Sequence, residues 1–390
     1  MPAGRRAKIL LLAVLALIVL FAAFLLEERV RGQLGLRHYV RSLAASGIKV
    51  SPADFVSHDP PEQNGADELW AAAKQFKKGG VLPDSRPPAM KLTSSGDAVV
   101  VFREADWVED KATQHWAQVA IDLQTNTAQL DAVCRALSKP VLNNHLDFNK
   151  APNFDFQPLS QAMQLTKWLG PAALSCLHEG KTSEAVKYLI AETRLPRSLA
   201  EDRILISELV RIAIAAVARG DTWEALQAGG FTDQDLSNLQ AAWEQLTFAT
   251  NMSESLQGEV VFGLKTTDEM RKSLKFTRGC LAQYAEEGGG EGDHNSVGLW
   301  LWRFAWLDQS EIDYLRADKE FIDLFHAAAA QKSLRTAQEE TQRMLARHEN
   351  RNFWDNLRYP FRQLVGIDAR CVPRVFRAET ERSTVLAAIA

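Results

Sequence analysis

Side chains capable of acid–base or metal chemistry are scattered along this chain. His58 with Asp59, and His145 with Asp147, lie in segments expected to be loops, where each pair could contribute to an acid–base site. A metal site needs three or four converging ligands, and neither pair has them nearby in the sequence. The G-x-S-x-G and H-E-x-x-H patterns of serine hydrolases and zinc peptidases are absent. We therefore assign no catalytic residue, metal or cofactor, and expect solvated or structural roles for both pairs.

One short segment imitates the end of a phosphate-binding loop. Gly180-Lys181-Thr182 has the required order, but the position of the upstream glycine is occupied by Ser175. The flanking residues predict helix–turn–helix rather than strand–loop–helix, so the backbone amides would not surround a phosphate. We interpret the segment as a turn between two helices.

The cysteine spacing and the net charge argue against a zinc site and against nucleic-acid binding. Cys134, Cys176, Cys280 and Cys371 lie far apart, without the close spacing of a zinc site. In an oxidising compartment they could form one or two disulfides, whose pairing stays open, and four buried thiols are the alternative. The net charge of −4 gives no general attraction to nucleic acid, so we expect no nucleic-acid partner.

A tryptophan-rich segment, Leu299–Leu307, is suited to contacts rather than catalysis. Trp300 shares one helical face with Phe304, and Trp302 shares another with Trp306, so this helix would be apolar almost all round. We expect it to be buried in the core. Contact with the headgroup layer of a membrane, which tryptophan rings favour, and docking of a partner protein are the alternatives.

An arginine series repeats every four residues near the C-terminus, at Arg343, Arg347 and Arg351. It could attract anionic lipid or an acidic partner. We favour the alternative, a solvated helix face whose charge is balanced by Glu339 and Glu340. The candidate partner or membrane contacts are therefore Trp300, Trp302, Trp306, Arg343, Arg347 and Arg351.

These residues belong to a chain that begins with a long apolar run. Eighteen apolar residues, Ile9–Leu26, follow the basic Arg5, Arg6 and Lys8. Such a helix covers about 27 Å, close to the hydrocarbon thickness of a bilayer, whereas a cleavable signal peptide has a shorter apolar region followed by small residues. We predict an uncleaved single-pass anchor in the cytoplasmic (inner) membrane, with the N-terminus inside and the body in the periplasm or extracytoplasmic space. A removed signal peptide is the alternative.

The whole chain has the composition of a folded protein, with 46% hydrophobic and 24% charged residues. Helical periodicity dominates beyond the apolar run. We predict a mainly α fold, in which the transmembrane helix precedes an α-helical hairpin body, similar to a solenoid, with an irregular segment rich in proline and glycine. The expected regions are a basic head (1–8), the anchor (9–26), a juxtamembrane helix (27–46), the irregular segment (47–110), a helical body (111–250) and a tryptophan- and arginine-rich helical region (251–390).

Four local elements stand out within these regions. An apolar stripe predicts one helix over Trp116–Leu137, and a second helix is expected over Ala66–Phe76. Val99–Phe102 is the one convincing strand-like run, which is too little for a sheet. Thr232, followed by two aspartates, is a suitable helix N-cap.

An internal repeat with an offset of 40 residues relates Ala172–Lys187 to Ile212–Gln227. Each copy consists of an apolar helix, a turn at Gly180 or Gly220, and a Glu-Ala pair that opens a second helix. The repeat predicts stacked helical hairpins, and coincidence between alanine-rich helices is the alternative.

The first copy resembles a tetratricopeptide-type repeat. The turn and second helix of that family are matched in order by Gly180, Ala185, Leu189 and Pro196. The offset of 40 rather than about 34 residues is a departure from the family pattern. This resemblance concerns residues 158–228 and implies a surface that binds proteins or peptides.

The chain as a whole resembles a loose group of uncharacterised bacterial membrane-anchored helical proteins. The residues that carry this resemblance are the apolar N-terminal run and the Pro-Pro-Glu-x-Asn segment, Pro60–Asn64. It implies an anchor and a long helical body, and it implies no activity.

Two classes of function remain. The first is a membrane-anchored extracytoplasmic interaction or scaffold protein, or a subunit of a membrane assembly, which binds another protein or a second copy of itself through its hairpins. The second is a hydrolase-like enzyme with an unrecognised site between residues 47–110 and the helical body. The repeat and the anchor favour the first.

Overall fold

The computed structural model describes residues 3–82, 89–93, 96, 98–100, 115–288, 296–331, 334–349, 358 and 362–390. Its α-helices are α1 (Ala3–Ala45), α2 (Ala66–Ala73), α3 (Trp116–Thr125), α4 (Thr127–Leu137), α5 (Gln157–His178), α6 (Thr182–Arg194), α7 (Leu205–Ala228), α8 (Asp233–Glu244), α9 (Phe248–Lys272), α10 (Leu274–Gly288), α11 (Ser296–Ala305), α12 (Leu307–Gln331), α13 (Leu334–Glu349) and α15 (Arg362–Ile389). The 3₁₀ helices are η1 (Pro52–Phe55), η2 (Pro61–Gln63), η4 (Phe148–Lys150) and η5 (Leu195–Asp202), and β1 (Ala89–Met90) pairs with antiparallel β2 (Ala98–Val99). The predicted mainly α fold is confirmed.

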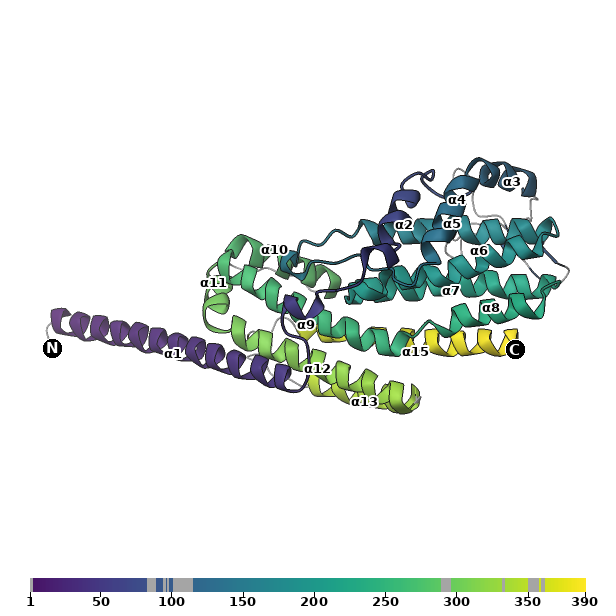
Figure 1. The fold of residues 1–390 in the computed structure, drawn as a ribbon. Coiled ribbons are helices and arrows are strands. Elements are labelled where there is room, and N and C mark those ends of the chain that lie inside the picture. Colours follow the sequence, from purple (N-terminus) through teal and green to yellow (C-terminus); the bar gives the residue numbers. More distant parts are fainter. Residues whose placement is uncertain are drawn as a thin grey trace.

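Helix α1 has two parts with different surroundings. Its apolar N-terminal part projects from the body (Figure 1), and only 6% of its most apolar 18-residue window is buried. By length and composition this helix could cross a membrane. Its C-terminal part packs against α11 and α12. The helix expected beyond residue 26 is present as the continuation of α1, which runs unbroken to Ala45.

The body is a stack of long helices. Helix α5 packs against α6 and α7, and α8 packs against α6 (Figure 1). Helices α9 and α12 pair closer to α1, and α15 contacts α7, α8, α9 and α13. One core cluster contains fully buried aromatic residues from both predicted helical regions, including Trp168, Trp243, Phe248, Phe321 and Phe325. The two regions therefore fold around a shared core.

Local sequence signals explain several helix boundaries. Thr232 Oγ1 accepts a hydrogen bond from Asp235 N–H at 3.2 Å, and Asp235 Oδ2 accepts one from Thr232 N–H at 3.1 Å. This capping box confirms the predicted N-cap of α8. Gly180 has a φ of +73° directly after α5, as the predicted turn requires.

The single helix predicted over Trp116–Leu137 is wrong at its centre. Helix α3 ends and α4 begins at Asn126. The Asn126 side chain donates to the Asp122 carbonyl at 2.8 Å, which satisfies a backbone acceptor near the end of α3. Elsewhere, the helix expected over Ala66–Phe76 is present as α2, and β2 overlaps the strand-like run Val99–Phe102 only at Val99. Val101 and Phe102 lie outside the described residues.

The second copy of the predicted repeat does not form a hairpin at Gly220. Helix α7 runs through this glycine to Ala228, and the chain turns at Gly229 and Gly230, both with positive φ, before α8. A Cβ at Gly220 would meet nothing within 4 Å, so its surroundings do not require a glycine. Helices α5 and α6 do form a hairpin, whereas α8 packs against α6 and α15.

Candidate functional site

A polar groove lies where the irregular segment meets the helical body. Residues 54–59 form one side and residues 140–143 another, with η5, α7 and the α8–α9 connection completing it. The hollow has a volume of about 510 Å³. The lining side chains that carry its charge and hydrogen-bonding capacity include Asp59, Asn143, Arg197, Arg203 and Arg211.

Asn64 joins the irregular segment to the groove wall formed by residues 140–143. Its Nδ2 donates to the Asn143 carbonyl at 2.7 Å, and its Oδ1 accepts from Asn143 N–H at 3.0 Å. Beside it, the Gly65 N–H donates to the Val141 carbonyl at 2.9 Å. Asn64 is the last residue of the Pro-Pro-Glu-x-Asn segment, whose prolines restrict the backbone at the start of the η2 turn. This segment therefore has a structural role at the groove.

Behind the wall, Asn144 belongs to a chain of polar side chains. Its Oδ1 accepts from Trp70 Nε1 at 2.6 Å, and its Nδ2 donates to Asp202 Oδ1 at 2.8 Å. Ser207 Oγ donates to Asp202 Oδ2 at 2.7 Å. Burial raises the pKa of Asp202 to about 6 in spite of these hydrogen bonds. These hydrogen bonds fix the wall formed by residues 140–143 against η5 and α7, so the groove is preorganised.

Tight backbone packing positions Arg203 between η5 and α7. Arg203 has a φ of +53°, the left-handed region that residues other than glycine rarely adopt. Gly258 of α9 lies directly against its carbonyl group: a Cβ there would be 1.6 Å from the oxygen. The Arg203 guanidinium pairs with Glu201 at 2.7 Å and with Glu254 at 3.6 Å.

The groove arginines differ in how their charges are balanced. Arg211 is buried, forms an ion pair with Glu208, and donates from Nε to the Pro196 carbonyl at 2.9 Å. Arg197 donates from Nη2 to the Pro140 carbonyl at 2.8 Å.

Among the described residues, Arg197 has no carboxylate within ion-pair distance. Partial burial, and then the charge of Arg194, lower the pKa of Arg197. An anionic group bound at Arg197 would therefore compensate a charge that the protein leaves unbalanced.

Among the groove residues, Ser57 and Asp59 come closest to the nucleophile and base of a hydrolase. Ser57 Oγ donates to Asp59 Oδ2 at 2.5 Å, and Asn143 Nδ2 donates to the same oxygen at 3.1 Å. These hydrogen bonds lower the pKa of Asp59. A carboxylate with a lowered pKa is a weak base and activates a serine hydroxyl poorly. The pair is better suited to accepting a hydrogen bond from a ligand.

The two His–Asp pairs of the sequence are not acid–base pairs in the structure. His145 Nε2 lies 3.1 Å from Asn64 Nδ2, while Asp147 caps η4 by accepting from Asn149 N–H at 3.0 Å. His58 is exposed, and Asp59 lines the groove. Within the described ranges, no group of three or more His, Cys, Asp and Glu side chains could hold a metal ion.

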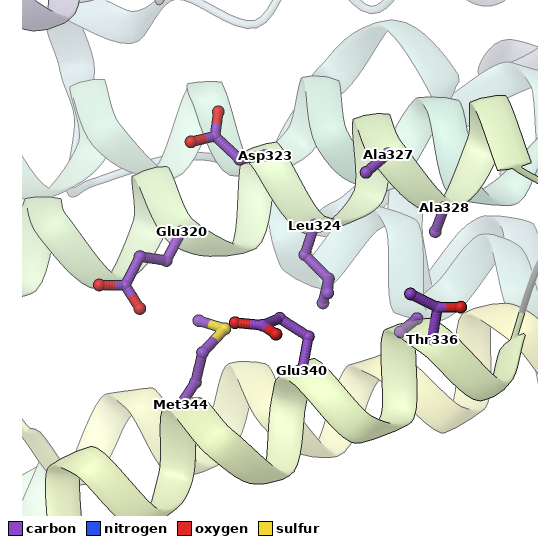
Figure 2. A pocket seen from close by; sticks show the side chains of 9 residues that line it. Glu320, Asp323, Leu324, Ala327, Ala328, Thr336, Glu340 and Met344 are labelled. Atoms are coloured by element: carbon purple, nitrogen blue, oxygen red, sulfur yellow. The ribbon is translucent and has the colours of Figure 1, made fainter.

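A second hollow, of about 400 Å³, lies between α12 and α13 (Figure 2). Its carboxylates are Glu320 and Asp323 on α12 and Glu340 on α13, and Leu324 and Met344 point into it from opposite helices. This hollow is acidic with an apolar interior. Its lining differs from that of the groove, which combines guanidinium groups with amides and carboxylates.

A third hollow, of about 360 Å³, lies beside the α5–α6 hairpin. Cys176 lines it, and burial followed by the charge of Glu184 raises the pKa of this thiol to about 11, so it is not a reactive thiolate. Lys181 N–H donates to the Cys176 carbonyl at 2.8 Å and closes the turn at Gly180. The predicted helix–turn–helix context is confirmed here. Cys134, Cys176 and Cys280 carry free thiols.

The tryptophan-rich segment forms α11 and the start of α12. Trp302 and Trp306 are buried in a second apolar cluster with Leu25 and Leu299, as predicted. Trp300 is 47% exposed, so the expected burial is wrong for this residue. The reason is that α11 packs against the rest of the protein through the opposite face.

The predicted arginine series is described only in part. Arg343 is exposed on α13 and forms an ion pair with Glu340 at 3.0 Å. Arg351 and the side chain of Arg347 lie outside the described residues.

Sequence reasoning missed Arg197, Asn143 of the groove wall and Asn144 behind it. The signal available for Asn143 and Asn144 is their position shortly after Pro140, where polar amides follow the end of a helix. Arg197 has no comparable local signal, because its environment depends on Pro140, which is distant in the sequence.

No protein-family model, curated protein or solved structure matches this chain. The functional argument therefore depends on the geometry described above.

Proposed function

We propose that this protein is a membrane-anchored interaction protein whose polar groove binds an acidic segment of a partner protein. The observation that carries the proposal is Arg197, a partly buried guanidinium in a preorganised groove without a carboxylate partner among the described residues. A carboxylate of the partner would form a charge-assisted hydrogen bond with it. Asn143 and Asp59 provide further polar contacts for an extended backbone.

Helix α1 supplies the anchor in this proposal. Residues 9–26 span the cytoplasmic membrane, Arg5, Arg6 and Lys8 keep the N-terminus inside, and the body lies outside the cytoplasm. The packing of Leu25 in the body's second apolar cluster supports an anchor that is retained, because cleavage after residue 26 would remove part of that cluster. Hydrolysis is supported less well, since Asp59 is a weak base for Ser57.

Site-specific photo-crosslinking in intact membranes tests the groove. A benzoylphenylalanine at Val56, which lines the groove and is 61% exposed, should form an adduct of defined mass with one protein. Replacing Arg197 with Gln in the same chain should reduce that adduct at least tenfold. Ile121, on α3 and 56% exposed, is the matched control position outside the groove.

An adduct that is equally strong at Ile121, or that is unaffected by Arg197→Gln, would contradict the proposed groove. An adduct with a second copy of this chain would identify self-association through the groove. Digestion of the body by external protease in spheroplasts, with intact cells as control, tests the proposed orientation separately.

A further inference from the structure

Helix α11 lies at the end of the body from which the apolar part of α1 projects (Figure 1). Specific contacts join α1 to α11 and to the residue that follows it: the Phe24 and Trp306 ring centroids lie 6.5 Å apart, and the Arg29 guanidinium lies 4.6 Å from the Phe304 ring centroid. Both α1 residues are close to Leu26, the last residue of the apolar run.

The helical rise places these contacts at the edge of a bilayer. At about 1.5 Å per residue, Phe24 lies about 3 Å inside the end of the apolar run, and Arg29 about 4.5 Å beyond it. A bilayer that surrounds residues 9–26 therefore reaches its headgroup layer where α11 packs against α1.

The outer face of α11 is apolar at the depth of this headgroup layer. Val297 is 64% exposed and Trp300 is 47% exposed, one helical turn apart. Trp300 stacks on Phe304 with ring centroids 5.5 Å apart, so the exposed indole is held against the ring that Arg29 covers. We call Val297, Trp300 and Phe304 the α11 patch.

We infer that the α11 patch rests in the headgroup layer of the same membrane that α1 spans. Two observations select lipid as the occupant: continuity of the patch with the helix that enters the bilayer, and the exposed tryptophan, whose amphipathic ring favours that depth. Arg29 beside Phe304 places a guanidinium at the same depth, where a long basic side chain can reach the lipid headgroups. The contact would hold the body in one orientation relative to the membrane. This inference rests on the anchoring proposed above.

Depth-dependent fluorescence quenching tests the inference. The full chain is reconstituted in vesicles of phosphatidylcholine and phosphatidylglycerol, in which the phosphatidylcholine carries bromine either close to the headgroup or near the chain ends. Bromine close to the headgroup should quench the tryptophan emission more strongly, and Trp300→Phe should remove a measurable part of that quenching. Trp223, 57% exposed on α7, is the matched control, and Trp223→Phe should leave the quenched emission unchanged.

Equal quenched emission in Trp300→Phe and Trp223→Phe would overturn the inference. The inference would also be overturned if another protein, rather than lipid, covered the α11 patch. Circular dichroism of each variant checks that it is folded. A chain that fails to float with the vesicles would instead contradict the proposed anchor, so the two failures are distinguishable.

Discussion

Trp306 donates a hydrogen bond of 2.9 Å from its indole Nε1 to Glu28 Oε2, across 278 positions of the sequence. Glu28 is buried two residues after the end of the apolar run, and Gln309 Nε2 donates to the same carboxylate oxygen at 3.0 Å. The helix that could cross a membrane is therefore part of the folded body rather than a tail attached to it. A charged group in this position is tolerated because donors from α12 and Arg31 of α1 surround it.

Trp306→Phe should destabilise this junction. The substitution keeps most of the apolar volume and removes one donor to a buried carboxylate, which costs about 1–3 kcal/mol. Thermal unfolding in detergent micelles, followed by circular dichroism, measures the loss. Trp223→Phe is the control, because Trp223 is exposed on α7. Equal melting temperatures for the two variants would show that the hydrogen bond contributes nothing.

Alanine substitutions at Gly180 and Gly220 should change stability in opposite directions. Gly180 has a φ of +73°, so an alanine there costs about 1–2 kcal/mol. Gly220 lies inside α7 with free space around a Cβ, so an alanine there should stabilise by up to about 1 kcal/mol. Urea unfolding in micelles compares the two. A loss of stability at both positions would support the turn at Gly220 that the repeat predicts.

Gly258→Ala should disturb the groove through Arg203. The new Cβ would lie 1.6 Å from the Arg203 carbonyl oxygen, and we expect a cost of about 3 kcal/mol or more. Gly279→Ala on α10 is the control, because a Cβ there meets nothing within 4 Å. The Val56 crosslink should weaken in Gly258→Ala and persist in Gly279→Ala. A fully stable Gly258→Ala protein would contradict the close packing.

Stability should fall as the pH rises from about 4 to above 7, and a buried carboxyl pair should contribute to this fall. Burial, and then the neighbouring acid, raise the pKa of Glu192, and burial raises that of Asp221 to about 7 from an ordinary 3.8. Both groups lie against Gly170, where a Cβ would be 2.1 Å from Asp221 Oδ2. The folded state binds these protons more tightly than the unfolded state, so the stabilisation is present below the unfolded pKa and is lost through the folded pKa.

Asp221→Asn therefore should gain stability at pH 8 relative to the parent and flatten the profile between pH 5 and 8. Urea unfolding at several pH values measures this change. Asp59→Asn is the control, since the lowered pKa of Asp59 gives stabilisation that is lost only at acidic pH. An Asp221→Asn profile parallel to that of the parent would exclude the carboxyl pair as the cause.

The features predicted correctly from the sequence are those that depend on neighbouring residues. The apolar run, the capping box at Thr232 and the turn at Gly180 each depend on a few consecutive residues, so periodicity and capping rules were sufficient. The break at Asn126 was missed because the apolar stripe continues across it, while one side-chain hydrogen bond decides the boundary.

The groove could not be predicted because it is assembled from distant segments. Asn64 and Asn143 are 79 positions apart, and Arg197 reaches Pro140 across 57. The hairpin predicted at Gly220 is wrong for a related reason: glycine permits a turn but does not require one, and Gly220 lies inside the continuous helix α7. The exposure of Trp300 likewise depends on which face of α11 packs against α1.

The most direct test of the central claim is the intact mass of the protein extracted from cell membranes. A retained anchor that forms part of the body predicts a chain that still contains residues 9–26 and stays in the membrane fraction after a carbonate wash. A mature chain that starts beyond residue 26 and is recovered in the soluble fraction would contradict the claim.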